Sequence, residues 1–226
     1  MPLHIFEARY RVLFNTLLAG AEGLEEGLIQ YDKPFCGSRQ FGMCWMNSDG
    51  GLAAIGTLLR IERHSRMPDG RLAVDNLGVQ RFRVLRVLEQ APVLMCEVEM
   101  LQDEDDSSEE VQALAAEVAG AFRDLLQLNH RMGRIQASKD SLVLGELESM
   151  RPRDLSFWIG SVFADNSRHQ QSLLQEDSTL ERLKQEHHVL VGTVSYLRAK
   201  LALEGAFSGD SDSSSGSGTG SGSEIV

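Results

Sequence analysis

The stretch PLHIFEARYR, at residues 2–11, joins the end of a strand to the start of a helix. Leu3 and Ile5 alternate with other residues as at the end of a buried strand, whereas apolar residues from Phe6 to Leu18 recur at helical spacing. A strand that passes directly into a helix must be packed at both ends. We therefore expect this segment in a core, with Ile5 and Phe6 buried.

The residues that follow, up to 101, form short apolar segments separated by turn-forming residues. The clearest turns are NSDGG at 47–51 and PDG at 68–70, where glycine accepts positive φ and proline presets the corner. In residues 81–88 the alternation changes phase, which predicts a β-bulge near Val84-Leu85. Evenly spaced strands of this kind predict a small barrel or sandwich, with Phe82 and Val84 in its core. The expected strands are 28–31, 41–46, 52–63, 72–77, 81–88 and 93–101.

The second half of the sequence is typical of helices. Capping-box patterns that begin at Ser107, Ser167 and Ser178 predict three helix starts. The acidic run at 103–106 is interpreted as a solvated linker, because its spacing does not match a calcium-binding loop. Residues 131–150 are interpreted as a loop with some helix.

The last predicted helix, residues 178–203, has the most regular apolar pattern in the chain. Its seam repeats at alternating spacings of three and four, which is typical of a heptad. The helix can pack along the preceding helices, which is the simpler interpretation, or pair with a second copy of the chain. His187 lies in the seam and is interpreted as a hydrogen-bonded core histidine. The seam consists of Leu180, Leu183, His187, Leu190, Val194, Leu197 and Leu201.

Residues 2–11 resemble the hallmark of the LON substrate-binding domain, the N-terminal module of Lon proteases that also occurs alone. Further matching blocks follow in the family's order, and the resemblance covers residues 1–203. It implies an α+β fold, with a PUA-like β-barrel at 1–101 and a helical bundle at 102–204 that ends in one long helix. Residues 205–226, which are rich in serine, glycine and acids, are expected to be a disordered tail. The matching blocks are RQFG at 39–42, IGT at 55–57 with PDGR at 68–71, NLGVQRFRV at 76–84, and QQSLLQ at 170–175 with LERL at 180–183.

The family motif residues are interpreted as structural, with Arg9 and Arg81 as partners of nearby carboxylates such as Glu7. Candidate polypeptide-binding residues are Tyr31 and Phe35, in a loop that separates the first helix from the RQFG strand, and Trp45 just beyond it. The alternative is that these aromatic rings fold back onto the barrel. The motif residues are Pro2, Leu3, Ile5, Phe6, Glu7, Arg9, Tyr10, Gly42, Gly56, Gly78, Arg81 and Phe82.

Composition excludes several function classes. The chain is 42% hydrophobic and 24% charged, as in soluble globular proteins, and its net charge of −11 argues against a nucleic-acid partner. Cys36, Cys44 and Cys96 fit neither a disulfide framework nor a zinc site, which favours a reducing, intracellular location. No apolar run approaches the ~20 residues of a membrane helix.

The motifs of the other Lon domains are absent from the sequence. The dipeptide Gly-Lys never occurs, so there is no Walker A phosphate cradle, and neither a G-x-S-x-G elbow nor a counterpart of the Lon Ser–Lys domain is present. We therefore expect a protein with no catalytic residue, cofactor or metal. The expected function is a non-catalytic adaptor or substrate selector in protein quality control, which binds unfolded polypeptide or a protease or ligase subunit.

Two other functions remain open. One is a fragment or accessory subunit of an ATP-dependent serine protease, and the other is a structural protein that homodimerises through its last helix. The chain most resembles stand-alone LON-domain proteins of photosynthetic eukaryotes, which implies a plastid location. Family members usually carry a strand before residue 2. We expect that truncation has removed this strand together with any transit peptide; the alternative is that the strand is missing and its neighbour has an open edge.

Overall fold

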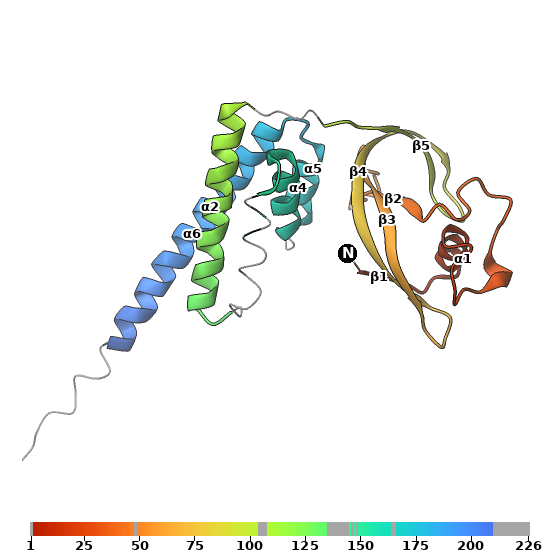
Figure 1. Ribbon diagram of the computed structural model, residues 1–226, viewed down its shortest axis with the longest axis horizontal. Coiled ribbons are helices and arrows are strands. Elements are labelled where there is room, and N and C mark those ends of the chain that lie inside the picture. The colour runs from red at the N-terminus through yellow and green to blue at the C-terminus, as the bar shows by residue number, and fades with distance from the viewer. Residues whose placement is uncertain are drawn as a thin grey trace, which may run out of the picture. The chain divides into compact units, whose positions relative to one another are not determined.

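The computed structural model describes residues 2–47, 49–103, 108–134, 145, 147, 149–163 and 166–209 (Figure 1). The chain divides into two compact units. The sheet unit comprises Met1–Glu104 and Asn166–Asp177, and the helical unit comprises Asp105–Asp165 and Ser178–Val226. An antiparallel sheet with separate helices, the last of them long, is the α+β class that the sequence predicts.

The sheet is organised around β4 (Leu72–Glu89), its longest strand. One edge of β4 pairs with β3 (Ile55–Arg66), which in turn pairs with β2 (Gln40–Met43). The other edge pairs with β1 (Pro2–Ile5) near the start of β4 and with β5 (Met95–Met100) near its end.

Two strand predictions need correction and one bulge is confirmed. The predicted strands 72–77 and 81–88 are one continuous strand, because Gly78 pairs with Leu59 and carries the ladder across the interval. The structure has no strand at 28–31, where the sequence predicts one. A 3-10 turn, Glu26–Leu28, includes the first of these residues. The register shifts between Val84 and Arg86, where the change of phase predicts a bulge.

Helix α1 (Ala8–Leu17) packs against the sheet and forms the core of the sheet unit. Ile5 is buried, as expected, but Phe6 is 65% exposed and its predicted burial is wrong. Phe6 directly follows Ile5 at the end of β1, and successive side chains of extended backbone point to opposite sides. The core side chains are Ile5, Phe14, Leu17, Leu18, Ile61, Leu72 and Val74.

Phe82 fills the space above two motif glycines in neighbouring strands. It is buried, whereas Val84 is only partly so. A Cβ atom at Gly56 would lie 2.5 Å from the Phe82 ring, and one at Gly42 would lie 3.0 Å from it. These two glycines are therefore required by the ring that packs over them.

Replacing Phe82 with alanine should lower the free energy of unfolding of the sheet unit by about 3–5 kcal/mol, because the ring leaves a cavity. Urea unfolding followed by Trp45 fluorescence measures this change, in a Trp158→Phe background that silences the tryptophan of the helical unit. Leu85→Ala is the matched control, since Leu85 lies on the same strand and is 55% exposed. Equal, small effects of the two substitutions would contradict the placement of Phe82.

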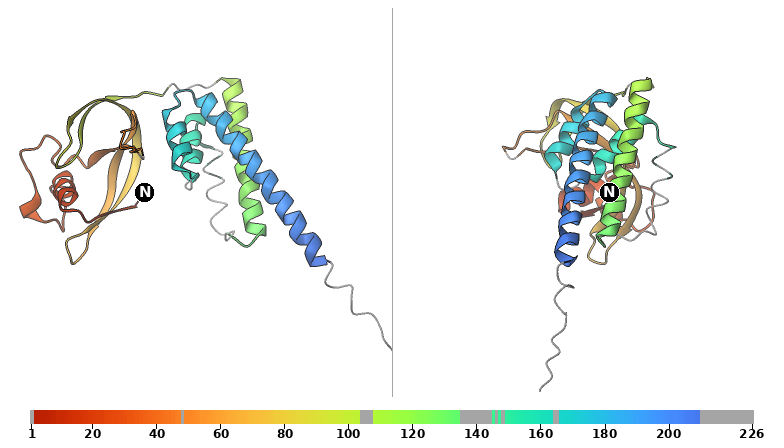
Figure 2. Two further views of the ribbon diagram at one scale, coloured as in Figure 1. Left: turned by 180° about the vertical axis from the view of Figure 1, so that it is seen from behind. Right: turned by 90° about the vertical axis from the view of Figure 1, so that its left-hand side faces the viewer.

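The helical unit contains the helices α2 (Glu109–Arg131), α4 (Pro152–Val162) and α6 (Thr179–Gly209). Helices α2 and α6 lie side by side and run in the same direction (Figure 2). Ser178 caps α6 as predicted, since its Oγ accepts a hydrogen bond from the Glu181 amide at 3.3 Å. For α2 the cap is Ser108, while the predicted cap, Ser107, lies outside the described residues.

The seam of α6 packs inside its own unit. Leu183, Leu190, Val194 and Leu197 are buried, which agrees with the internal-packing interpretation. His187 is not a core residue: its side chain remains 32% exposed, with Nε2 3.7 Å from a Glu117 carboxylate oxygen. The neighbouring Glu186 is fully buried instead.

Several predicted bounds in the second half of the chain differ from the structure. Helix α6 continues to Gly209, past its predicted end at 203 and into the expected tail, and the rest of that tail lies outside the described residues. Most of the predicted loop 131–150 also lies outside them. Helix α5 (Ser167–Gln175), which falls in the predicted helical half, belongs to the sheet unit, because its buried residues pack there. Its cap is Asn166 rather than the predicted Ser167.

None of the helices in the described ranges is long and apolar enough to cross a membrane.

Candidate functional site

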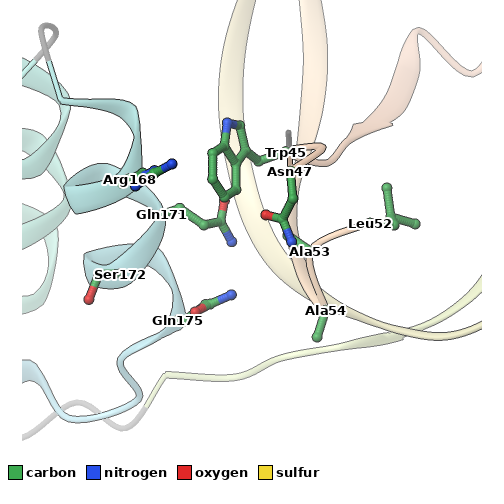
Figure 3. A pocket seen from close by; sticks show the side chains of 9 residues that line it. All are labelled: Trp45, Asn47, Leu52, Ala53, Ala54, Arg168, Gln171, Ser172 and Gln175. Carbon is green, nitrogen blue, oxygen red and sulfur yellow. The ribbon is translucent and has the colours of Figure 1, made fainter. Parts of the chain in front are cut away.

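A groove of about 370 Å³ lies in the sheet unit, between the β2–β3 loop and α5 (Figure 3). Its walls are mostly polar and rich in side-chain amides. The lining residues are Trp45, Asn47, Leu52, Ala53, Ala54, Arg168, Gln171, Ser172 and Gln175.

The β2–β3 loop is a small hairpin that presents Trp45 and Asn47 to the groove. The Ala53 amide donates to the Trp45 carbonyl at 2.9 Å, and the Asn47 amide donates to the Gly51 carbonyl at 2.8 Å. Gly50 has a φ of +83°, which glycine adopts without strain. The turn chemistry at 47–51 that the sequence predicts therefore fixes one wall of the groove.

Helix α5 forms the other wall with one of its faces. Arg168, Gln171 and Gln175 are spaced by three and four residues, so they line the same side of the helix. Figure 3 shows these three side chains pointing toward the loop that carries Trp45 and Asn47. Gln171 is only 8% exposed, and its Nε2 donates to the Ile55 carbonyl on β3 at 3.0 Å.

Arg81 of β4 fastens the end of α5 to the sheet. It is 4% exposed, and its Nη1 donates to the carbonyls of Leu174 at 2.7 Å and Glu176 at 3.1 Å. Its Nη2 donates to the Asp177 carboxylate at 3.1 Å and also to the Asp103 carboxylate. Arg81 thus holds the two segments by which the chain leaves the sheet unit, at Asp103 and at Asp177.

The structure agrees with one sequence interpretation here, that Arg9 and Arg81 pair with carboxylates, and changes another, that of the acidic linker. The carboxylate partners of Arg81 are Asp103 and Asp177, while it is Arg9 that pairs with Glu7, at 2.8 Å. The expected solvated linker begins with a residue that is not solvated, since the Asp103 side chain is only 11% exposed. Glu104 and the other residues up to Ser107 lie outside the described residues.

The candidate aromatic residues do not form one patch. Trp45 lines the groove. Phe35 packs against the α1 core, which agrees with the alternative that this ring folds back onto the sheet unit. Tyr31 is 65% exposed and its phenol donates to the Glu26 carboxylate at 3.3 Å. The sequence analysis did not identify the groove residues of α5, although the QQSLLQ block, which carries all of them except Arg168, is part of the family resemblance.

The groove offers recognition groups rather than reactive ones. Beside it, burial and the neighbouring Cys96 raise the pKa of the Cys44 thiol to about 11, so that thiol is a poor nucleophile at neutral pH. In the described part of the chain, no cluster of three His, Cys, Asp or Glu side chains could hold a metal ion. Amides, one hydroxyl, one guanidinium and an indole remain, and these groups bind by hydrogen bonds and packing.

The model of the ATP-dependent protease La (LON) substrate-binding domain matches residues 1–192. The chain belongs to the LON substrate-binding domain family. The matched region of this LON domain includes neither the ATPase nor the protease domain of Lon.

Relatives and solved structures agree with this assignment. The LON domain is 25% identical over 203 residues to a Lon protease of Dictyoglomus thermophilum, covering 86% of this chain and 25% of that protein. It is 24% identical to a Lon protease of Cytophaga hutchinsonii, covering 80% of this chain and 23% of that protein. The chain therefore spans about a quarter of the length of these relatives.

Two solved structures share the fold. The Lon N-terminal domain protein from Xanthomonas campestris has a TM-score of 0.52 at 26% identity, covering 82% of this chain and 86% of that one. The N-terminal domain of Mycobacterium avium complex Lon protease has a TM-score of 0.56 at 18% identity, covering 86% and 90%. These likenesses support the α+β arrangement of a Lon N-terminal domain.

Proposed function

We propose that this LON domain is a non-catalytic substrate selector that binds unfolded polypeptide in the groove between the β2–β3 loop and α5. The observation that carries the proposal is the amide lining of the groove. Side-chain amides both donate and accept hydrogen bonds, as the polypeptide backbone does. A groove of this kind suits any extended chain with unpaired backbone groups.

Two further features support a polypeptide over other ligands. Trp45 provides a large aromatic contact area, and aromatic side chains dominate the binding energy of protein interfaces. The net charge of −11 disfavours a polyanion such as a nucleic acid. In a cell the domain would act as an adaptor in protein quality control, delivering bound chains to a protease or ligase.

The binding of fluorescein-labelled casein, a protein without stable folded structure, tests this proposal by fluorescence anisotropy. Trp45→Ala should weaken binding about tenfold or more, because it removes the aromatic wall of the groove. Tyr196→Ala is the control, since Tyr196 is 66% exposed on α6 and does not line the groove. Equal binding by both variants and the unmodified chain would refute a role for the groove. Hydrolysis of ATP or casein by the purified chain would refute the non-catalytic assignment.

The plastid location and the pairing of two copies through α6 remain predictions. Imaging of the natural protein fused to a fluorescent protein tests the first, and a dispersed signal outside plastids would contradict it. Sedimentation equilibrium tests the second, and a monomer at all concentrations would contradict it.

A further inference from the structure

We infer that the groove recognises two features of an extended polypeptide segment: a backbone N–H, which Gln171 Oε1 accepts, and a carboxylate, which pairs with Arg168. The inference rests on the proposed polypeptide binding and names the chemistry of the bound segment. Both residues come from the same face of α5 (Figure 3).

Gln171 is a preorganised hydrogen-bond acceptor. The residue is 92% buried, and the bond from Nε2 to the Ile55 carbonyl, at 3.0 Å, fixes the plane of its amide. Within the described residues, Oε1 accepts no hydrogen bond, although the residue lines the groove. A fixed acceptor loses little conformational entropy when it binds a donor, so a backbone N–H placed there gains most of the hydrogen-bond energy.

Arg168 places a positive charge on the α5 wall of the groove. It is exposed, and among the residues that the structure describes it makes no ion pair. None of the residues that line the groove is acidic. The guanidinium fork matches a carboxylate in geometry as well as in charge, so a carboxylate is the ligand group that this wall favours.

The spacing of these two groups limits where the carboxylate can lie on the bound segment. Residues three apart on a helix have Cβ atoms about 5–6 Å apart. An extended chain advances about 3.3 Å per residue. The carboxylate should therefore belong to a residue one or two positions from the N–H that Gln171 binds, and it is either an Asp or Glu side chain or the terminal carboxylate.

The experiment uses short overlapping peptides of casein, each labelled with fluorescein and each made with a free and an amidated C-terminus. The tightest binder is then remade with its Asp and Glu residues changed to Asn and Gln one at a time, and with each backbone N–H methylated in turn. Binding to the full chain is measured by anisotropy at low and high salt. Removing the carboxylate should weaken binding about three- to fivefold at low salt, and less at high salt. Methylation at one nearby position should weaken it about tenfold.

Arg168→Met tests the protein side, with Arg134→Met as the control. Arg134 is also exposed, makes no ion pair among the described residues and does not line the groove. Arg168→Met, but not Arg134→Met, should abolish the preference for the peptide with the carboxylate over the peptide in which that carboxylate is an amide. Circular dichroism of both variants establishes that they are folded.

The outcomes separate this inference from the proposed function. Weaker binding of the peptide with an amidated C-terminus identifies the terminal carboxylate as the partner of Arg168, and weaker binding after one Asp or Glu is changed to its amide identifies that side chain. Either result supports the inference. Equal binding of acidic and amide peptides, equal effects of the two arginine substitutions, or tolerance of methylation at every position would overturn the inference while peptide binding persists. Absence of binding by casein and by all its peptides would overturn the proposed function itself.

Discussion

Replacing Arg81 with methionine is expected to lower the free energy of unfolding of the sheet unit by about 3–5 kcal/mol, the usual cost of breaking a buried ion pair from one side. Methionine keeps most of the apolar stem but removes every donor. The Asp103 carboxylate, whose side chain is 11% exposed, would then lose the cation that it faces. The carbonyls of Leu174 and Glu176 would lose their side-chain donors at the end of α5.

Urea unfolding monitored by Trp45 fluorescence in the Trp158→Phe background measures the effect. Arg86→Met is the matched control: Arg86 lies on the same strand and pairs with Glu97, but its side chain is 70% exposed, so its loss should cost less than about 1 kcal/mol. Because α5 forms one wall of the groove, Arg81→Met should also weaken casein binding. A variant as stable as Arg86→Met would show that Arg81 does not hold α5.

Local patterns in the sequence predicted the features that neighbouring residues determine. Apolar segments between turn-forming residues located most of β3, β4 and β5, and the change of phase located the bulge at Val84. The first turn chemistry, at 47–51, located the loop that carries Trp45. Phe6 was placed wrongly because it belongs to both patterns: it starts the helical periodicity, but the backbone there is still extended.

Contacts between distant residues could not be predicted in this way. The bond between Gln171 and Ile55 joins residues 116 apart, and the bond from Arg81 to Leu174 joins residues 93 apart. Periodicity shows only that α5 has an apolar face, and it does not identify the surface that this face contacts. The groove depends on that contact, so the sequence alone predicted one of its walls and missed the other.

The seam of α6 illustrates a different limit. Glu186 follows Leu183 by three residues and His187 follows it by four. Either spacing is compatible with a heptad that continues at Leu190. A straight helix drifts relative to a heptad repeat, so either position can face the core. The strict alternation of three and four residues selected His187 for the seam, whereas the structure buries Glu186.

Glu186 is expected to make the stability of the helical unit depend on pH. Neither carboxyl oxygen accepts a hydrogen bond from a described residue, and the side chain is fully buried. Arg182, one turn earlier, is held by the hydroxyls of Ser156 and Thr179, each at 3.1 Å. Burial raises the pKa of Glu186 to about 9, against the opposing effect of the Arg182 charge.

The direction of the dependence follows from proton binding. Below the ordinary pKa of 4.5, Glu186 is protonated in both the folded and the unfolded chain, so it contributes no pH dependence. Between pH 4.5 and about 9 the unfolded chain is ionised while the folded chain keeps the proton, so unfolding releases one proton. The free energy of unfolding therefore falls as pH rises through this window, by about 1 kcal/mol or slightly more per pH unit, and levels off above it.

Urea unfolding at pH 5.5, 6.5 and 7.5, monitored by Trp158 fluorescence in a Trp45→Phe background, measures this slope. Glu186→Gln cannot ionise, so it should remove the contribution of Glu186 to the slope and stabilise the unit by several kcal/mol at pH 7.5. Glu181→Gln is the control on the same helix, because Glu181 is half exposed and pairs with Lys184 at 2.8 Å. It should leave the slope as it is in the unmodified chain. An unchanged slope in Glu186→Gln would mean that Glu186 is already ionised when folded, with a charge partner close enough to compensate for its burial.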